Sequence, residues 1–190
     1  MSPESAREPR GRIDEAMFRH VMGHFASGVA VVTARDRDRD FGSTASALTS
    51  LSLSPPMLLV CLDRDSETRK AITATRRFVV NVLSDKQEQV ARRFAEKSKT
   101  KFEGQQLSRS EAGLAQLADA LAYLECEVAE TAVGGTHTVF LAEVRSAAAY
   151  AGAPLTYFRG RFGRLAYDRR EGSTPRERAK PRDRAKPRER

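Results

Sequence analysis

Hydroxyl-bearing and small side chains alternate through residues 42–56 of this 190-residue chain, with the sequence Gly-Ser-Thr-Ala-Ser-Ala-Leu-Thr-Ser-Leu-Ser-Leu-Ser-Pro-Pro. Small residues let a ligand approach the backbone, and backbone N–H and hydroxyl groups can then donate hydrogen bonds to a planar ring or a phosphate. A hydroxyl-rich strand on a half-exposed sheet has the same composition. Composition alone therefore leaves a ligand-binding surface and a purely structural strand as equal alternatives.

The histidines and cysteines give little support for hydrolytic or metal chemistry. His20 and His24 stand four residues apart and would share a helix face, but no HExxH motif or carboxylate ligand set accompanies them. Cys61 and Cys126 lie in apolar runs, as is typical of buried thiols in a cytoplasmic protein. We therefore predict no metal site and no disulfide framework, and we find no catalytic triad.

The net charge of +8 belongs mostly to one end of the chain. Residues 168–190 contain ten Lys/Arg and five Asp/Glu, so they carry five of the eight net positive charges. Their density of proline and mixed charge prevents a packed element. We predict disordered segments at 1–12 and 168–190 and one folded domain at 13–167. We do not expect the folded domain to bind nucleic acid. Binding of a polyanion by the tail alone would depend strongly on salt.

The sequence also gives no sign of a membrane protein. The first residues are polar and lack the apolar core of a signal peptide, and no run approaches the roughly 20 apolar residues of a membrane-spanning helix. We expect a cytoplasmic protein.

Three helices are expected to flank the residues that carry the chemistry. Asp14 is a candidate N-cap of the first, which would run to Gly28. Ser66 and Asp85 are candidate N-caps of the other two, the first of them ending near Thr75. The apolar residues of the first helix recur at helical spacing: Met17, Phe18, Val21, Met22 and Phe25.

Short apolar and β-branched runs predict about seven or eight strands, with a loop at 96–112. The polar run 35–40 and the pair Gly134 and Gly135 predict hairpins, and Pro55-Pro56 predicts a break. The expected strands are 29–33, 41–48, 57–62, 78–83, 121–133, 137–148, 155–158 and 162–167. No βαβ alternation and no GxGxxG motif is present, so we expect a mainly β, closed antiparallel barrel with peripheral helices instead of a dinucleotide-binding Rossmann fold.

The order of several sequence blocks, spanning about residues 13–167, resembles the flavin reductase family. The blocks are FRHVMGHFASGVAVVT at 18–33, GSTASA at 42–47, SLSPP at 52–56, RFVVNVL at 77–83, RF at 93–94, KF at 101–102, LAYLECEV at 121–128, GGTHTVFLAEV at 134–144 and PLTYFRGRF at 154–162. Each block alone is a weak signal, whereas their joint order and spacing are specific.

The resemblance implies the reductase component of a two-component flavin monooxygenase, built as a Greek-key split β-barrel. Such an enzyme transfers a hydride from NADH or NADPH to FMN or FAD, and the reduced flavin diffuses to a partner monooxygenase. The resemblance also implies a homodimer with the flavin near the subunit interface. The cofactors do the hydride chemistry, which agrees with the lack of a catalytic triad.

The resemblance further implies which residues form the site. Thr44, Ala45, Ser46 and Ala47 match the stretch that contacts the flavin ring, and Cys61 and Leu62 match positions whose backbone lines the flavin site. The phosphate or adenylate end is implied for Ser66, Arg69, Phe94, Lys99 and Lys101. The nicotinamide side is implied for His137, as the catalytic residue, and the dinucleotide pocket for Tyr157, Arg159 and Gly160.

One departure from the family pattern concerns the expected catalytic histidine. The family usually has Gly-Asp-His where this chain has Gly135-Thr136-His137, so a carboxylate is lost. This loss leaves open the choice between NADH and NADPH. It also supports an alternative of another class, a non-catalytic protein that binds or stores flavin on the same barrel.

Overall fold

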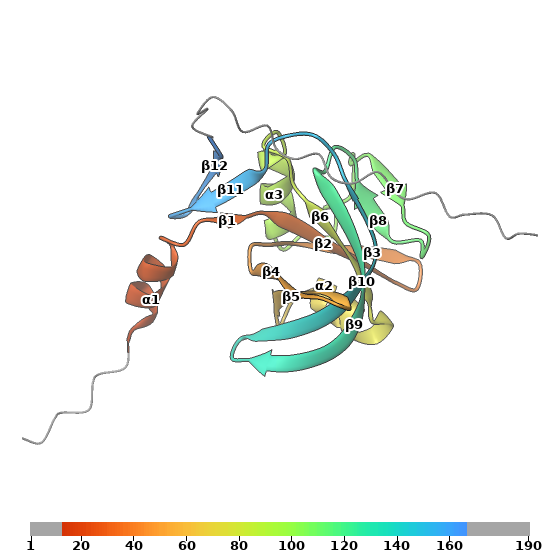
Figure 1. The fold of residues 1–190 in the computed structure, drawn as a ribbon, viewed down its shortest axis with the longest axis horizontal. Coiled ribbons are helices and arrows are strands. Elements are labelled where there is room, and N and C mark those ends of the chain that lie inside the picture. Colours follow the sequence, from red (N-terminus) through yellow and green to blue (C-terminus); the bar gives the residue numbers. More distant parts are fainter. Residues whose placement is uncertain (1–12, 167–190) are drawn as a thin grey trace, which may run out of the picture.

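The computed structural model describes residues 13–166 and is mainly β (Figure 1). Three helices are present: α1 Glu15–Met22, α2 Glu67–Thr75 and α3 Glu88–Ala95. The strands are β1 Ser27–Gly28, β2 Ala30–Asp36, β3 Arg39–Ala45, β4 Leu48–Leu53, β5 Pro56–Asp63, β6 Arg77–Val82, β7 Leu107–Arg109, β8 Ala115–Leu117, β9 Ala122–Gly134, β10 His137–Ala149, β11 Leu155–Phe158 and β12 Arg161–Arg164. The segments predicted to be disordered, 1–12 and 168–190, lie outside the described residues.

Seven strands form one antiparallel sheet in the order β3-β2-β6-β9-β10-β5-β4. Within residues 13–166 no backbone pairing joins the edge strands β3 and β4, so the predicted closed barrel is not confirmed. The chain itself links the two edges, because residues 46–47 lead directly from β3 to β4. The amide of Cys61 in β5 donates to the carbonyl of Ala47 at 3.0 Å, which fixes this link against the far side of the sheet.

Both faces of β2 and β6 are buried along most of their length, whereas buried and half-buried residues alternate along β5. Along β2, Val32 packs into a cluster with Phe78 and Phe140, which α2 covers with Ile72. Val31 faces the opposite way, into a cluster with Phe94 of α3. The sheet therefore has one helix on each face, and the cavity described below lies beside its free edge.

Two of the three predicted helix N-caps are confirmed. The side chains of Asp14 and Ser66 accept hydrogen bonds from the third residue after each. The prediction for Asp85 is wrong, because α3 begins after Gln87, whose side chain accepts from the Ser84 amide and donates to the Ala118 carbonyl. The first helix ends at Gly23 and not at Gly28, since β1 begins at Ser27.

The predicted hairpins are confirmed, and four strands, β1, β4, β7 and β8, are additional to those expected. The turns between β2 and β3 and between β9 and β10 lie where the polar run and the Gly-Gly pair place them. Residues 48–53 form an edge strand, β4, before the expected proline break. Strands β7 and β8 pair with each other, so the end of the predicted loop at 96–112 is partly ordered as strand.

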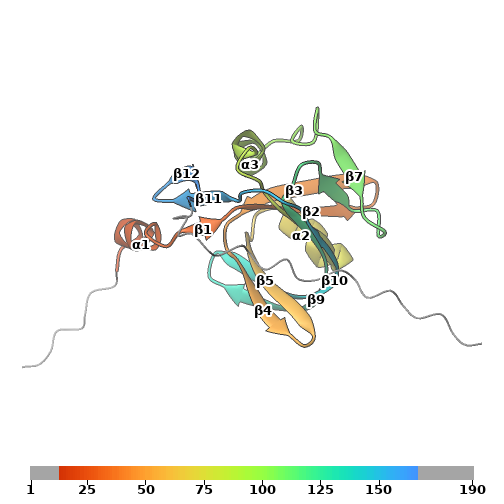
Figure 2. The ribbon, with the colours of Figure 1, turned by 45° about the horizontal axis from the view of Figure 1, so that its top comes forward.

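Helix α1 and the small sheet β1-β11-β12 project from the body of the molecule (Figures 1 and 2), and we call this unit the arm. Within the arm, Arg159 N donates to Gly23 O at 2.8 Å, and the rings of His24 and Phe158 meet edge to face. The expected apolar face of α1 exists but is uncovered. Five large apolar side chains of this region are 50–74% exposed: Met17, Phe18, Val21, Met22 and Phe25.

Candidate functional site

A cavity of about 770 Å³ runs along the free edge of β3. Its walls are β3, the end of β5, the first turn of α2 and the segment that follows α3. It brings together most of the predicted site residues, namely Thr44, Ala45, Ser46, Ala47, Cys61, Leu62, Ser66, Phe94, Lys99, Lys101 and His137. Residues that are distant in sequence, from Arg39 to His137, therefore meet at one place.

Because β3 lies at the edge of the sheet, some of its backbone groups are free to bind a ligand. β3 pairs with β2 on one side only, so backbone N–H and C=O groups on its other side have no strand partner in the sheet. The small residues Ala45, Ser46 and Ala47, at the end of β3 and in the link that follows it, leave this part of the cavity wall without large side chains. A planar ligand can therefore lie against this edge and receive hydrogen bonds from the backbone.

Three hydroxyl groups meet where β3 passes the N-terminus of α2. The Ser43 hydroxyl lies 3.1 Å from the Ser66 hydroxyl and 2.8 Å from the Thr68 hydroxyl. We call Ser43, Ser66 and Thr68 the hydroxyl cluster. Because Ser66 is the N-cap of α2, the cluster adjoins unpaired helix N–H groups and the positive end of the helix dipole, a combination that suits a phosphate.

Lys101 holds the segment after α3 against β3. Its ammonium group donates to the carbonyls of Gly42 and Phe94, at 3.1 Å each, and burial lowers the pKa of Lys101 below its ordinary value. Two of its three hydrogens are thus used inside the protein, whereas Lys99 of the same segment has an exposed side chain at the cavity wall. The arrangement favours Lys99 over Lys101 as a partner for a ligand phosphate.

An aromatic pair forms the wall next to Gly42. The rings of Phe94 and Phe102 meet edge to face with centroids 5.0 Å apart. A Cβ atom at Gly42 would lie only 2.5 Å from a ring carbon of Phe94. Gly42 is therefore required for this close approach between β3 and α3.

His137 begins β10 and faces the last residue of β5. Its ring Nδ1 lies 2.9 Å from the hydroxyl of Thr136, and its partner in the strand register is Asp63. The hydrogen bond to Thr136 occupies Nδ1, so Nε2 is the ring atom available to a ligand. The contact with Thr136 restricts the orientation of the His137 ring.

Cys61 lies beside the cavity but is a poor nucleophile. Burial raises the pKa of its thiol above the ordinary value, so the thiolate is scarce at neutral pH. The backbone amide of Cys61 donates a hydrogen bond to the carbonyl of Ala47. Cys61 therefore contributes to the cavity wall through its backbone and the small size of its side chain, and not through thiol chemistry.

Four predicted site residues do not line the cavity. Arg69 lies on α2 and donates to the carbonyl of Arg64, while its Nε is buried without a hydrogen-bond partner. Tyr157, Arg159 and Gly160 belong to the β11–β12 hairpin of the arm.

Several residues of the cavity were not among those predicted. Ser43, Thr68, Asp63 and Phe102 are such residues, together with Arg39 and Phe41. The two-residue repeat of a strand offers a signal for part of this set, because the positions 39, 41, 43 and 45 share one face of β3. Thr68 and Asp63 depend on how α2 packs against β3, which the sequence does not reveal.

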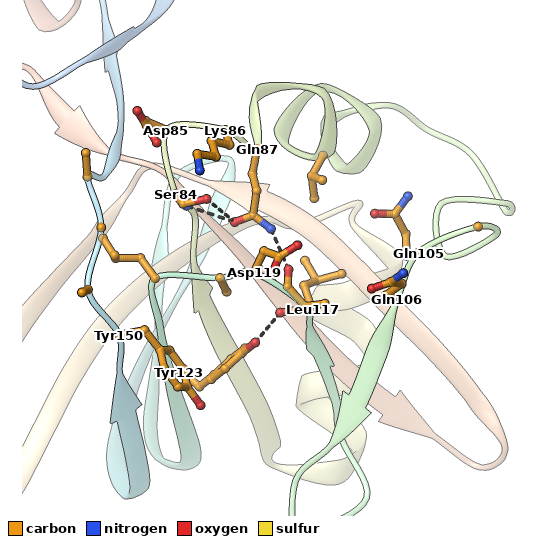
Figure 3. A pocket seen from close by; sticks show the side chains of 18 residues that line it. Ser84, Asp85, Lys86, Gln87, Gln105, Gln106, Leu117, Asp119, Tyr123 and Tyr150 are labelled. Atoms are coloured by element: carbon orange, nitrogen blue, oxygen red, sulfur yellow. Dashed lines mark hydrogen bonds between the residues drawn. The ribbon is translucent and has the colours of Figure 1, made fainter.

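A second, larger cavity of about 910 Å³ lies between the start of α3 and the ends of β8, β9 and β10 (Figure 3). Its central polar side chains serve the fold. Tyr123 donates to the Leu117 carbonyl, Gln87 joins Ser84 to Ala118, and Tyr150 meets the Tyr123 ring edge to face. The cavity along β3 is therefore the better candidate site, because its lining combines a strand edge that has no strand partner with a hydroxyl cluster at a helix N-terminus.

Neither a metal site nor a membrane helix is found in the described part of the chain. Residues 13–166 contain no group of three or more His, Cys, Asp or Glu side chains placed to hold a metal ion. None of their helices has the length and apolar character needed to cross a membrane.

Comparison with known proteins places the chain in one family. The sequence profile of the flavin reductase like domain matches residues 22–166. The reductase component of a 4-nitrophenol 4-monooxygenase/4-nitrocatechol 2-monooxygenase from Rhodococcus opacus is 47% identical over 151 residues, which cover 80% of this chain and 81% of that protein. An NADH-dependent FAD reductase from Streptomyces globisporus is 37% identical over 176 residues, covering 90% and 94%.

The fold agrees with a solved structure of the same kind. The NADH:FAD oxidoreductase of Streptomyces globisporus, determined in complex with NAD and FAD fragments, superposes with a TM-score of 0.79. The two are 39% identical, and the match covers 82% of this chain and 95% of the other.

Proposed function

This chain belongs to the flavin reductase like domain family, and on that premise we propose that it transfers a hydride from NADH to FMN or FAD as the reductase of a two-component monooxygenase. The observation that carries the proposal is the cavity along β3, where a free strand edge with small residues leads into the hydroxyl cluster. One part suits a flat ring and the other suits a phosphate, which are the two ends of a flavin mononucleotide.

The residues present fit a flavin at this place. The ring-sized part is bordered by small side chains, and the backbone edge offers donors and acceptors to the heteroatoms of a flavin ring. The phosphate end combines three hydroxyls, the N-terminus of α2 and Lys99. Reduced nicotinamide and flavin supply the hydride donor and acceptor, and the protein is required to bind and orient them.

The protein contributes position, electrostatics and exclusion of water. The edge of β3 holds the flat ring, while Phe94 and Phe102 form a dry wall next to it. Backbone N–H groups on the unpaired side of β3 would stabilise negative charge on a flavin ring bound there. His137 borders the same cavity and is placed to hold the nicotinamide side through Nε2, with Thr136 fixing the orientation of its ring.

The relatives support a monooxygenase partner and NADH as the donor. One relative is named as the reductase component of a monooxygenase and another as NADH-dependent. We propose that the reduced flavin leaves the open groove and diffuses to the partner enzyme, and that the protein works in the cytoplasm.

We also propose that the protein is a homodimer held by the arm. The uncovered apolar face of α1 needs a partner, because exposed apolar patches of this kind mark interaction sites. Tyr157 and Arg159 lie in the arm and do not line the cavity of their own subunit. An arm that reaches the other subunit would bring these residues to its cavity, which would account for their predicted role.

The function is tested by following the absorbance of NADH and NADPH with the purified protein and added FMN or FAD. Oxidation that depends on added flavin and is faster with NADH is the expected result. Flavin binding without oxidation of either nicotinamide would overturn the reductase assignment and support the alternative, a non-catalytic flavin-binding protein.

A further inference from the structure

The groove along β3 continues past the hydroxyl cluster. Beyond Ser43, the strand runs through Phe41 to Arg39, and both residues line the same cavity. Four residues of extended strand span about 13 Å, which is more than the phosphate of a mononucleotide needs. A ligand that ends at the hydroxyl cluster therefore leaves this end of the groove empty.

Arg39 and Phe41 form a flat surface at that end. The guanidinium carbon of Arg39 lies 5.1 Å from the centroid of the Phe41 ring, in a cation–π arrangement. Phe41 packs partly against the main core, which holds its ring in place. Arg39 has an exposed side chain, so one face of its planar guanidinium group is open to a ligand.

The charges near this surface disfavour a further phosphate. Asp65 and Glu67 line the same cavity, and Glu67 is close enough to Arg39 to interact with its charge. Lys70 hydrogen-bonds to Glu67 and, with a smaller contribution from the charge of Arg39, lowers the pKa of that carboxyl group. Asp40 is already paired with Arg109 and Arg35. A neutral aromatic ring suits this place better than another anion, and stacking on Arg and aromatic side chains is how proteins bind nucleobases.

We propose that Arg39 and Phe41 bind the adenine ring of FAD and thereby make this protein prefer FAD over FMN. The flavin ring would lie at residues 45–47, the phosphates at the hydroxyl cluster, and the adenine one ribose further along β3. This inference rests on the proposed function, because it presupposes that the groove binds a flavin.

The test compares the dissociation constants of FAD and FMN by calorimetry. For Arg39→Ala we expect the dissociation constant for FAD to rise about ten-fold while that for FMN stays the same. Arg39→Lys keeps the charge but loses the planar group, so it should lose most of the preference as well. Arg77→Ala removes the same charge from an exposed position outside the cavity and serves as the matched control.

Three results of the binding measurements would overturn the inference. They are an equal change for FAD and FMN in Arg39→Ala, no change for either, and a full FAD preference in Arg39→Lys. Adenine also occurs in NADH, so the KM for NADH is measured with FMN as acceptor and should not change. A raised KM for NADH with unchanged FAD binding would assign the surface to the nicotinamide dinucleotide and also overturn the proposal. Absence of any flavin binding by the wild type would instead refute the proposed function.

Discussion

Lys101 shows how a residue can be near a site without being free to act in it. The family resemblance implies a phosphate-binding role, but its ammonium group joins β3 to the end of α3 through two carbonyls. Its position in the cavity was predictable from sequence, whereas its hydrogen-bond partners depend on a fold that brings residues 42 and 94 together. Thr44 is similar, because its hydroxyl donates to the Ala91 carbonyl at 2.6 Å.

We expect substitution of His137 to weaken nicotinamide binding without weakening flavin binding. His137→Ala should lower kcat/KM for NADH about ten-fold through loss of one directed hydrogen bond. The flavin dissociation constant should stay within two-fold or so of the wild type. Thr136→Val removes only the partner of Nδ1 and should give a smaller loss of the same kind. Steady-state kinetics and flavin titration check this, and a large loss of flavin affinity would show that His137 acts on the flavin instead.

The buried thiol of Cys126 should make the free energy of unfolding depend on pH in the alkaline range. Burial, with a smaller effect of Glu125, raises the pKa of this thiol to about 12, against about 9 in an unfolded chain. The folded state therefore holds the proton more tightly, so this stabilisation is complete below pH 9 and is lost as pH rises toward 12. At pH 10.5 we expect a loss of about 2 kcal/mol in the free energy of unfolding relative to pH 8.

Urea unfolding at the two pH values measures this loss, with Cys126→Ala as the comparison. The variant lacks the titrating group, so its own loss between the two pH values should be smaller by a similar amount. Equal losses in the two proteins would show that other groups cause the alkaline sensitivity.

At the scale of elements, the site depends on how closely α3 and the segment after it approach β3. Gly42 permits this approach, since any larger residue would meet the Phe94 ring. Most of the strands and the N-terminal ends of α1 and α2 were predictable, because strand periodicity and helix N-caps are local signals. The start of α3 was not, because the side chain that organises it, Gln87, bonds to Ala118 across a gap of 31 residues.

Gly42→Ala should therefore destabilise the protein by about 1–3 kcal/mol, as overpacking of a tight contact does. It should also weaken flavin binding, because the displaced Phe94 belongs to the cavity wall. Thermal unfolding and flavin titration measure the two effects. Gly28→Ala is the matched control, since a Cβ there has no neighbour within 4 Å. Equal stability of the two variants would contradict the packing that we describe.

At the scale of the whole molecule, the arm is the feature that a single subunit does not explain. The amphipathic pattern of α1 is clear in the sequence. It predicts that one face of the helix will be covered, but it does not identify the surface that covers this face. The same limit applies to the edges of the sheet, since the strand count predicted a barrel whose closure is not confirmed.

Mixing two inactive variants tests whether the arm acts on the other subunit. If the site combines His137 of one subunit with Arg159 of the other, His137→Ala and Arg159→Ala should each be poorly active alone. After joint refolding, heterodimers contain one intact site, so about a quarter of the wild-type activity should return. Each variant refolded alone is the control. No recovery in a mixture shown to contain heterodimers would mean that each site is built within one subunit.

The central claim, that NADH reduces flavin in the cavity along β3, is tested most directly by filling that cavity. Ala47→Trp places an indole among the lining residues, and Thr49→Trp places one at an exposed site on β4 outside the cavity. The measurement is the loss of visible flavin absorbance after anaerobic mixing with NADH at a fixed, subsaturating flavin concentration. We predict that Thr49→Trp reduces flavin at the wild-type rate and that Ala47→Trp is slower by about ten-fold or more, because the bulky ring displaces the flavin. A wild-type rate for Ala47→Trp would contradict the account and place the reaction elsewhere on the molecule.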